Sequence, residues 1–209
     1  SRYSVVDKIK VLANYLPPDS APTIARWIDH FQCDFKISRA RNTKYGDYRP
    51  PHAGQGHRIS INYDLNPYAF LVTTVHEFAH LLTWNEHQRK AKPHGAEWKA
   101  NFKRMMRPFF EREIFPADIR QAIVRYLENP AASSCTDHQL FKALKKYDQT
   151  PEHLVLLESL PLGSVFKLKD GRVFRKDAKI RKRFRCTELA SGRLYLFNPL
   201  AEVELSAAV

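Results

Sequence analysis

The 209 residues include 34 lysines and arginines against 22 acidic residues, a formal net charge of +12, and 44% of them are hydrophobic. This length and composition fit one sizeable globular domain, or one domain with a small module. No run of 18 apolar residues occurs, so we expect no membrane-spanning segment and no membrane partner. Cys33, Cys135 and Cys186 are odd in number and far apart, which excludes a disulfide framework and predicts a reducing, intracellular location, cytoplasmic or nucleoid-associated.

The first third of the chain reads as helices followed by short strands. Residues 4–16 and 20–32 repeat apolar side chains at helical spacing, so each predicts an amphipathic helix. Residues 34–41 and 57–63 alternate apolar and polar side chains and predict two strands. Between them, Tyr45-Gly46-Asp47 predicts a turn, and the segment rich in Pro, Gly and His after it predicts a loop.

The next helix begins at Asn66-Pro67, because Asn caps a helix and Pro fits its first position. Apolar residues follow at 4-3-4 spacing and predict a face turned to the core: Leu71, Val75, Phe78 and Leu82. Small and polar residues fall on another face, which we expect to stay open for chemistry: Ala69, Thr73, His76, His80 and Thr83.

This helix contains the motif His76-Glu77-Phe78-Ala79-His80. Imidazoles four residues apart project from one helix face with Cβ atoms about 5–6 Å apart. That gap suits a single Zn²⁺, which binds each imidazole nitrogen at about 2.0–2.1 Å. Glu77 lies at the edge of the same face, where its carboxylate can reach a water on the metal without being a ligand. The motif predicts one zinc ion with Glu77 as the catalytic residue.

The third ligand has several candidates. The metzincin spacing is excluded because Thr83 and Glu86 stand where Gly and His are required. Glu97 could serve as in thermolysin-like sites, and His87 would lie on much the same face as His80 if the helix continued. His94 follows a polar loop and immediately precedes a new amphipathic helix, which favours it over Glu97.

HEFAH followed by HGAEWKANFKRMM resembles the SprT family of zinc metalloproteases, and the stretches RNTKYG (41–46) and RISIN (58–62) resemble the family's pattern before its active-site helix. The resemblance covers roughly residues 35–110. It implies an α+β, zincin-like domain in which helices pack on a small antiparallel sheet around a central HExxH helix. It also implies His76, His80 and His94 as zinc ligands, Glu77 as the catalytic residue, and a relationship to Spartan, which degrades proteins covalently trapped on DNA.

After the third candidate ligand the sequence predicts three more helices. Residues 98–110 carry an inner stripe that includes Trp98 and Phe102, Pro116 starts the second helix, and residues 137–147 form the third. Residues 131–134 read as a linker, and Pro151 is the expected domain boundary. The predicted metalloprotease domain is therefore residues 1–150.

Residues 151–209 predict a small all-β module. Asp170-Gly171 and Ser191-Gly192 are hairpin signals between segments of alternating polarity, so we expect four to five strands in an antiparallel sheet or barrel. The side chains available for its core are Val165, Phe174, Phe184, Leu194 and Leu196. Relatives often end in a zinc ribbon, but no CxxC pair is present here, so we expect no second zinc.

The positive charge is concentrated in residues 167–185 of this module, which hold ten basic and two acidic side chains. Such a cluster predicts backbone binding to DNA with little sequence specificity, and Phe166, Tyr195 or Phe197 could stack on bases. The predicted contacts are Lys167, Lys169, Arg172, Arg175, Lys179, Arg181, Lys182, Arg183 and Arg185.

These patterns favour an enzyme that cleaves DNA-associated or DNA-crosslinked proteins by metal-assisted hydrolysis, and we expect a monomer. An extended protein substrate would pair with an edge strand, either residues 34–41 or 57–63. His52 and His57 are weaker candidates for polarising the scissile carbonyl. Two alternatives stay open: a zinc peptidase that does not depend on nucleic acid, and a non-catalytic nucleic-acid-binding protein with a structural metal. Structural zinc normally has four protein ligands, which weighs against the second.

Overall fold

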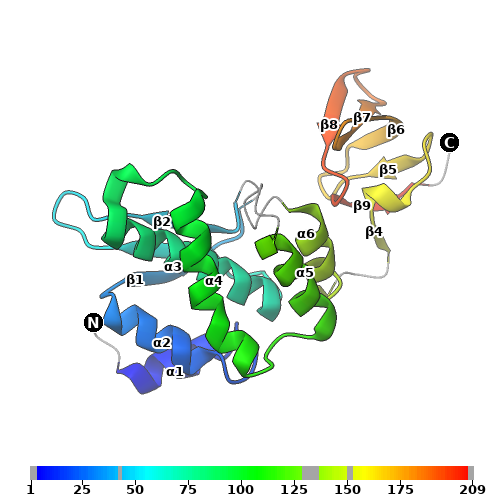
Figure 1. The fold of residues 1–209 in the computed structure, drawn as a ribbon. Coiled ribbons are helices and arrows are strands. Elements are labelled where there is room, and N and C mark those ends of the chain that lie inside the picture. The colour runs from blue at the N-terminus through cyan, green and yellow to red at the C-terminus, as the bar shows by residue number, and fades with distance from the viewer. Residues whose placement is uncertain (1–3, 42–43, 129–136, 150–152, 207–209) are drawn as a thin grey trace. The chain divides into compact units, whose positions relative to one another are not determined.

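The structure is a computed structural model that describes residues 4–41, 44–128, 137–149 and 153–206 (Figure 1). The chain divides into two compact units, residues 1–148 and 149–209. It is α+β, with six α-helices and two sheets in its described parts. The predicted boundary at Pro151 and the predicted linker at residues 131–134 lie outside the described residues. No helix among the described residues has the length and apolarity needed to cross a membrane.

The first unit alternates helices with a small sheet. Its elements are α1 (Val5–Leu12), α2 (Ala21–His30), β1 (Asp34–Ser38), β2 (Gly46–Arg49), β3 (Arg58–Asn62), α3 (Pro67–His87), α4 (Ala96–Glu111), α5 (Ala117–Glu128) and α6 (His138–Lys145). Local sequence explains the helix starts, since the side chains of Ser4, Asn66 and Asp137 each accept a hydrogen bond from a backbone N–H of the first turn.

The three strands form a mixed sheet in the order β1-β3-β2. β1 runs parallel to β3, with Phe35 opposite Ile59, and β2 runs antiparallel to β3, with Tyr48 opposite Ile59. The expectation of an antiparallel sheet is therefore wrong. Alternation along a strand shows which side chains share a face but does not fix the strand's partner, and here β3 is inserted between β1 and β2.

β2 occupies residues for which the sequence predicted a turn and the start of a loop. Gly and Asp are depleted in strands, and Gly46-Asp47 opens this one, so local preference pointed away from a strand. The presence of strand β2 changes where an extended substrate could pair with the sheet. β3 has partners on both sides, so residues 57–63 cannot serve as an edge strand, and the sheet's two edges are β1 and β2.

α3 lies at the centre of the first unit and packs against α4, β2 and β3. Its apolar side is fully buried, with Phe70, Leu71 and Phe78 inaccessible to solvent. Its polar face, which we expected to be open, is also covered, because His76 and Thr73 are each only 4% exposed. Packing of α4 on one side and of the strands on the other encloses the helix, which a single-helix pattern cannot reveal.

The second unit is a six-stranded sheet. In the order β4-β9-β5-β6-β7-β8, it consists of β4 (Leu154–Leu156), β9 (Glu202–Leu205), β5 (Val165–Lys167), β6 (Val173–Ile180), β7 (Arg183–Glu188) and β8 (Leu194–Phe197), and neighbouring strands are antiparallel. The predicted β5–β6 hairpin is present, with Gly171 at a φ of 88° in its turn. The strand count exceeds the predicted four to five.

The core of this sheet differs from the predicted one along β8. Phe174 and Phe184 are buried as expected, but Leu194 and Leu196 are 62% and 55% exposed. Strand pairing puts Tyr195 opposite the buried Cys186, so the aromatic side chains of β8 face inward and its leucines face outward. A shift of one residue exchanges the two faces of a strand, which is why alternation alone misassigned this one.

Candidate metal centre

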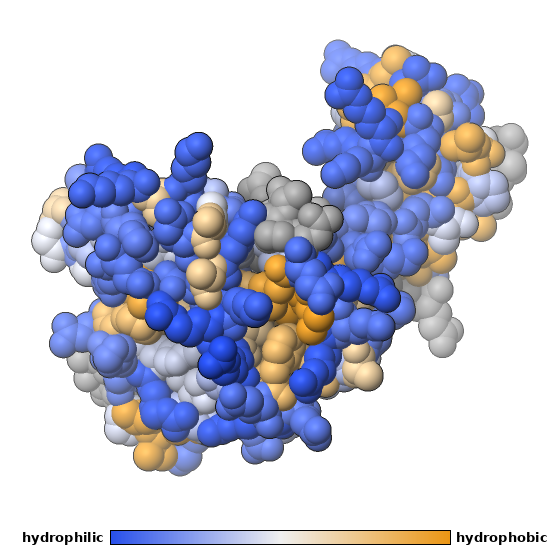
Figure 2. Space-filling model, viewed as in Figure 1, coloured by the Kyte–Doolittle hydropathy of each residue, from blue (hydrophilic) through white to orange (hydrophobic). Residues whose placement is uncertain are grey.

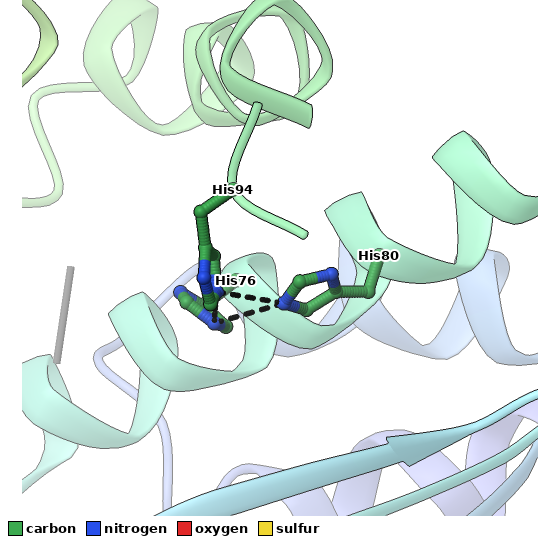
Figure 3. A group of neighbouring side chains, drawn as sticks. All are labelled: His76, His80 and His94. Carbon is green, nitrogen blue, oxygen red and sulfur yellow. Dashed lines mark hydrogen bonds between the residues drawn. The ribbon is translucent and has the colours of Figure 1, made fainter. Parts of the chain in front are cut away.

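Three imidazoles converge where the start of α4 approaches α3 (Figure 3). The Nε2 atoms of His76 and His80 are 3.2 Å apart, and the Nε2 atom of His94 lies 3.0 Å from each of them. Each ring nitrogen carries either one proton or one lone pair in the plane of its ring. Three such nitrogens arranged in a triangle therefore cannot each form a good hydrogen bond with both of the others. A cation accepts all three lone pairs, and tetrahedral Zn–N bonds of about 2.0–2.1 Å place nitrogens about 3.3 Å apart. The three side chains could therefore bind a metal ion.

The third member of the cluster is His94, while Glu97 is exposed and His87 ends α3 without joining the cluster. His94 has a φ of 57°, a left-handed conformation that is uncommon outside glycine. Gly95 then caps α4, and its backbone N–H donates to the carbonyl of Lys92 at 2.9 Å. Strained backbone of this kind concentrates at functional sites because the surrounding structure must hold it in place.

Burial keeps the imidazoles neutral. It lowers the pKa of His76 well below the ordinary value, and it lowers the pKa of His80 to about 4 with a further contribution from His94. Burial also lowers the pKa of His94, as does the nearby Lys99. Neutral imidazoles present lone pairs, which is the form that a metal ion needs.

Trp98 lies under the cluster. Its ring centroid is 4.7 Å from that of His76, 5.4 Å from that of His80 and 4.8 Å from that of His94, and the side chain is fully buried. Its Nε1–H donates to the backbone carbonyl of His76 at 3.3 Å. The sequence indicated Trp98 only as a core residue. His94 precedes the N-cap of α4, so helical spacing gave no signal that links Trp98 to the site.

Glu77 lies beside the cluster and is almost completely buried. Burial, and to a lesser degree the negative charge of Asp47, raises the pKa of Glu77 to about 8, while Arg41 and Lys44 act in the opposite direction. A metal ion bound to the neighbouring imidazoles would further favour the ionised carboxylate.

Gly46, the first residue of β2, is where the strand comes closest to this carboxylate. A Cβ atom at position 46 would lie 2.9 Å from Oε1 of Glu77 and 2.7 Å from Cγ2 of Thr73, distances that real contacts do not allow. Only glycine lets the strand backbone approach α3 so closely. A role for Gly46 at the site was not predicted, because Tyr45-Gly46-Asp47 is typical of a turn.

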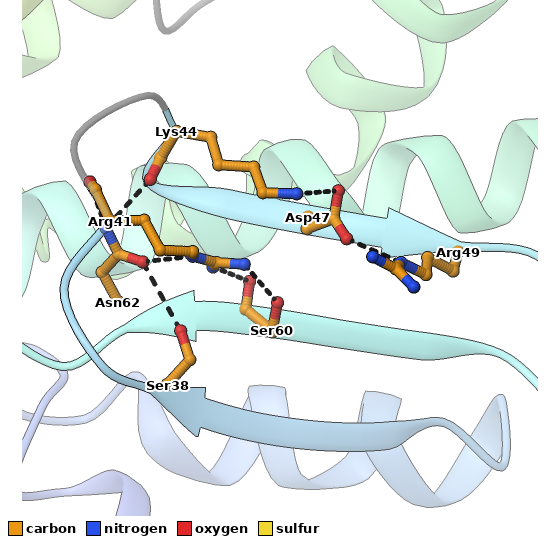
Figure 4. A network of polar contacts seen from close by, with 7 residues as sticks. All are labelled: Ser38, Arg41, Lys44, Asp47, Arg49, Ser60 and Asn62. Atoms are coloured by element: carbon orange, nitrogen blue, oxygen red, sulfur yellow. Dashed lines mark hydrogen bonds and ion pairs between the residues drawn. The ribbon is translucent and has the colours of Figure 1, made fainter.

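The charged residues near Glu77 are held by a polar network on the sheet (Figure 4). Lys44 Nζ lies 2.9 Å from an Asp47 carboxylate oxygen, and Arg49 Nε lies 3.1 Å from the other. Arg41 Nε donates to Asn62 Oδ1 at 2.8 Å, and Asn62 Nδ2 donates to the carbonyl of Lys44 at 2.9 Å. Asp47 is thus neutralised by two cations, and the segment before β2 is tied to β3.

A comparison with protein families bears directly on this site. The sequence model of the SprT-like family matches residues 23–120. Residues 23–120 are therefore similar to the SprT-like family. The resemblance predicted from the HExxH motif is thereby confirmed, and the SprT-like segment contains all three histidines, Glu77 and Gly46. No significant match was found among curated proteins or among solved structures.

Two weaker candidates in the SprT-like segment do not join the cluster. His57 Nδ1 is hydrogen-bonded to the Tyr48 hydroxyl at 2.8 Å. His52 is exposed and forms an isolated bridge with Gln55.

The predicted DNA-binding residues lie outside the SprT-like segment and fall into two groups. Three of them form ion pairs within the second unit: Lys167 with Glu204 at 3.6 Å, Arg172 with Asp170 at 2.9 Å, and Arg175 with Asp177 at 2.7 Å. The others are exposed and have no ion pair with another described residue: Lys169, Lys179, Arg181, Lys182, Arg183 and Arg185. All but Lys169 of this second group surround the turn between β6 and β7, which we call the basic hairpin tip.

The aromatic residues predicted to stack on bases are used differently. Phe166 is fully buried, and Tyr195 and Phe197 pack against the same core. The ring of Phe197 lies edge-on to Phe166, with centroids 5.6 Å apart. Full burial excludes stacking by Phe166, while Tyr195 and Phe197 are only partly buried, so stacking by these two stays a prediction.

Proposed function

We propose that the chain is a zinc-dependent metallopeptidase of zincin type that hydrolyses DNA-associated or DNA-crosslinked proteins. The observation that carries the proposal is the convergence of three Nε2 atoms within 3.2 Å of one another beside the buried carboxylate of Glu77. Catalytic zinc has three protein ligands and an open position, whereas structural zinc normally has four. Similarity to the SprT-like family supports a peptidase of this kind.

Bound Zn²⁺ would supply Lewis-acid chemistry by lowering the pKa of water and polarising a carbonyl oxygen. Glu77 would take a proton from the attacking water and return it to the departing amine. His76, His80 and His94 would remain neutral throughout, since burial opposes their protonation.

The free edge of β2 would bind the substrate in an extended conformation. β2 is paired on one side only, with β3, and it approaches Glu77 at Gly46. β1, the other edge considered from sequence, is separated from β2 by the whole of β3. Main-chain pairing with a strand edge gives affinity with little dependence on sequence, as a peptidase for many different DNA-bound proteins requires.

The basic hairpin tip would bind DNA. Five cationic side chains gather there without ion pairs to described residues, so they are available to phosphates. Such contacts are electrostatic and independent of base sequence. Cys33 and Cys186 are buried free thiols, which agrees with the cytoplasmic or nucleoid-associated location that we propose.

The test is cleavage of a DNA-binding protein by the zinc-loaded chain with and without single- or double-stranded DNA, comparing wild type with Glu77→Gln. We expect DNA-stimulated cleavage by the wild type, none by the variant, and equal zinc content in both. Equal cleavage without DNA would favour a peptidase that does not depend on nucleic acid. Bound zinc and bound DNA without any cleavage would favour a non-catalytic protein and contradict the proposal.

A further inference from the structure

A small pocket lies beside the N-terminal half of α3, in the first unit. Two elements form most of its wall: Leu65, Asn66, Ala69, Val72 and Thr73 belong to α3 and the two residues before it, and Phe141, Leu144, Lys145 and Asp148 belong to α6 and the turn after it. Tyr45, the residue before β2, completes the lining, with its ring centroid 5.3 Å from that of Phe141. Figure 2 shows apolar surface on the face of the unit where α3 and α6 lie in Figure 1.

This pocket is adjacent to the proposed catalytic carboxylate. Thr73, in its wall, lies four residues before Glu77, about one helical turn or about 6 Å along the axis. Tyr45 directly precedes Gly46, whose backbone fits against both Thr73 and Glu77. An extended peptide advances about 3.3 Å per residue. A peptide bound along β2 with its scissile bond at Glu77 would therefore reach the pocket within two residues of that bond.

The lining indicates an apolar occupant. Leu65, Ala69, Val72, Phe141 and Leu144 provide most of its walls. Among the polar lining residues, Asn66 donates to the carbonyl of Leu144 and to Asp148, and Lys145 pairs with Asp148. The cavity volume is about 40 Å³. One water requires about 10–15 Å³ on the same measure, so the space fits about three such groups. This is the size of the branched end of Val or Leu.

One wall of the pocket comes from outside the SprT-like segment, since α6 begins at His138 and the match ends at residue 120. Asn66, the N-cap residue of α3, holds α6 in place: its Nδ2 donates to the carbonyl of Leu144 at 2.9 Å. The pocket is therefore formed partly by residues outside the segment that matches the family model.

We propose that this pocket is a specificity subsite that binds a branched aliphatic side chain of the substrate within two residues of the scissile bond. The inference rests on the proposed peptidase function and deepens it. Main-chain pairing along β2 would accept many sequences, and this pocket would choose among the bonds within one bound segment.

The test uses the full-length zinc-loaded chain and a peptide library randomised at the two positions on each side of a central bond, with cleavage sites read by mass spectrometry. We expect the wild type to select Val or Leu at one of these positions. Ala69→Leu fills the pocket and should lower kcat/KM roughly tenfold or more for peptides with Leu at the selected position. For peptides with Gly or Ala at that position, kcat/KM should change little. Phe141→Ala enlarges the pocket and should extend the preference to Phe and Met.

The matched control is Ala117→Leu, which introduces the same side chain at an exposed position of α5 that does not line the pocket. It should leave the profile unchanged, and Glu77→Gln sets the background. Glu77-dependent cleavage with the same profile in both pocket variants would overturn the subsite while leaving the peptidase in place. Absence of cleavage by the wild type would overturn both. If Ala69→Leu fails to fold, by circular dichroism and zinc content, the result with Phe141→Ala decides.

Discussion

At the scale of single residues, the site contains side chains whose roles are not evident from the sequence pattern. Trp98 is a core residue by pattern, yet it contacts all three imidazoles and hydrogen-bonds the backbone of His76. His94 holds a left-handed backbone angle that glycine would adopt more easily. Both observations indicate that the position of the imidazoles is fixed by their surroundings before a metal binds.

Trp98→Phe should therefore weaken metal binding without unfolding the chain. Phenylalanine keeps most of the packing but loses the hydrogen bond to His76, and changes in the surroundings of ligands typically cost 10–100-fold in affinity. Competition with a chromogenic chelator would measure the zinc dissociation constant, which we expect to rise about tenfold. Trp27→Phe, in a partly buried tryptophan that packs on Phe78 and Phe109, is the matched control. Equal zinc affinity in both variants would contradict the role of Trp98.

The stability of the metal-free protein should fall as the pH is lowered from about 6.5 towards 4. The folded pKa of His80 is about 4, below the ordinary 6.5 of the unfolded chain. Between these values the unfolded chain binds a proton that the folded chain does not, so unfolding becomes more favourable as the pH falls. Urea denaturation of the chelator-treated chain at several pH values measures the effect. His80→Asn should flatten the profile, and an equally steep profile in that variant would assign the effect to other groups.

At the scale of elements, helices were predictable and strand pairing was not. The apolar spacing and the Asn66-Pro67 signal located α3, which runs from Pro67 to His87, because both are local properties of the chain. β2 was missed because its opening residues, Gly46 and Asp47, are poor strand formers locally. They are tolerated because of tertiary contacts: Gly46 allows the approach to Glu77, and Asp47 is paired with two cations.

At the candidate site too, local features were predictable from the sequence and tertiary features were not. The spacing of His76 and His80 predicted two of the converging histidines, and the position of His94 before a new helix, together with the family resemblance, favoured it as the third. The open face predicted for α3 was wrong because helix α4, distant in sequence, covers it. Leu194 and Leu196 were wrongly assigned to the core because the register of β8 depends on its partner β7 and not on its own alternation.

Gly46→Ala tests the close approach of β2 to α3. The added methyl group would displace the Glu77 carboxylate, and a displacement of about 1 Å can cost on the order of 100-fold in rate. We expect kcat to fall at least tenfold with unchanged zinc content, measured by peptide cleavage and metal analysis. Gly56→Ala is the control, since its Cβ would have only one neighbour, 3.9 Å away. Full activity in Gly46→Ala would show that β2 does not position the carboxylate.

At the scale of the whole molecule, the chain combines a SprT-like segment that contains the candidate metal site with a second unit that contains the basic segment 167–185. The structure reduces the number of candidate DNA-binding residues, because Lys167, Arg172 and Arg175 already form ion pairs with acidic side chains. The basic hairpin tip has none among the described residues.

Replacing Arg181, Lys182 and Arg183 with glutamine should weaken DNA binding and its salt dependence. Each phosphate contact contributes about 0.9 to the slope of log K against log salt on duplex DNA, so the loss of three contacts should lower the slope by roughly 2 to 3. Fluorescence anisotropy over a range of salt concentrations measures it. The matched triple variant at Lys167, Arg172 and Arg175 should change the slope less. A larger change of slope in the second triple variant than in the first would contradict DNA binding at the basic hairpin tip.

The central claim is that three imidazoles bind one zinc ion and leave one position open. X-ray absorption at the zinc edge of the purified chain tests it most directly. We predict one zinc per chain, three imidazole nitrogens at about 2.0–2.1 Å and one oxygen ligand from solvent, all lost in His94→Ala. A sulfur ligand, a fourth protein ligand, or a spectrum unchanged by His94→Ala would contradict the account.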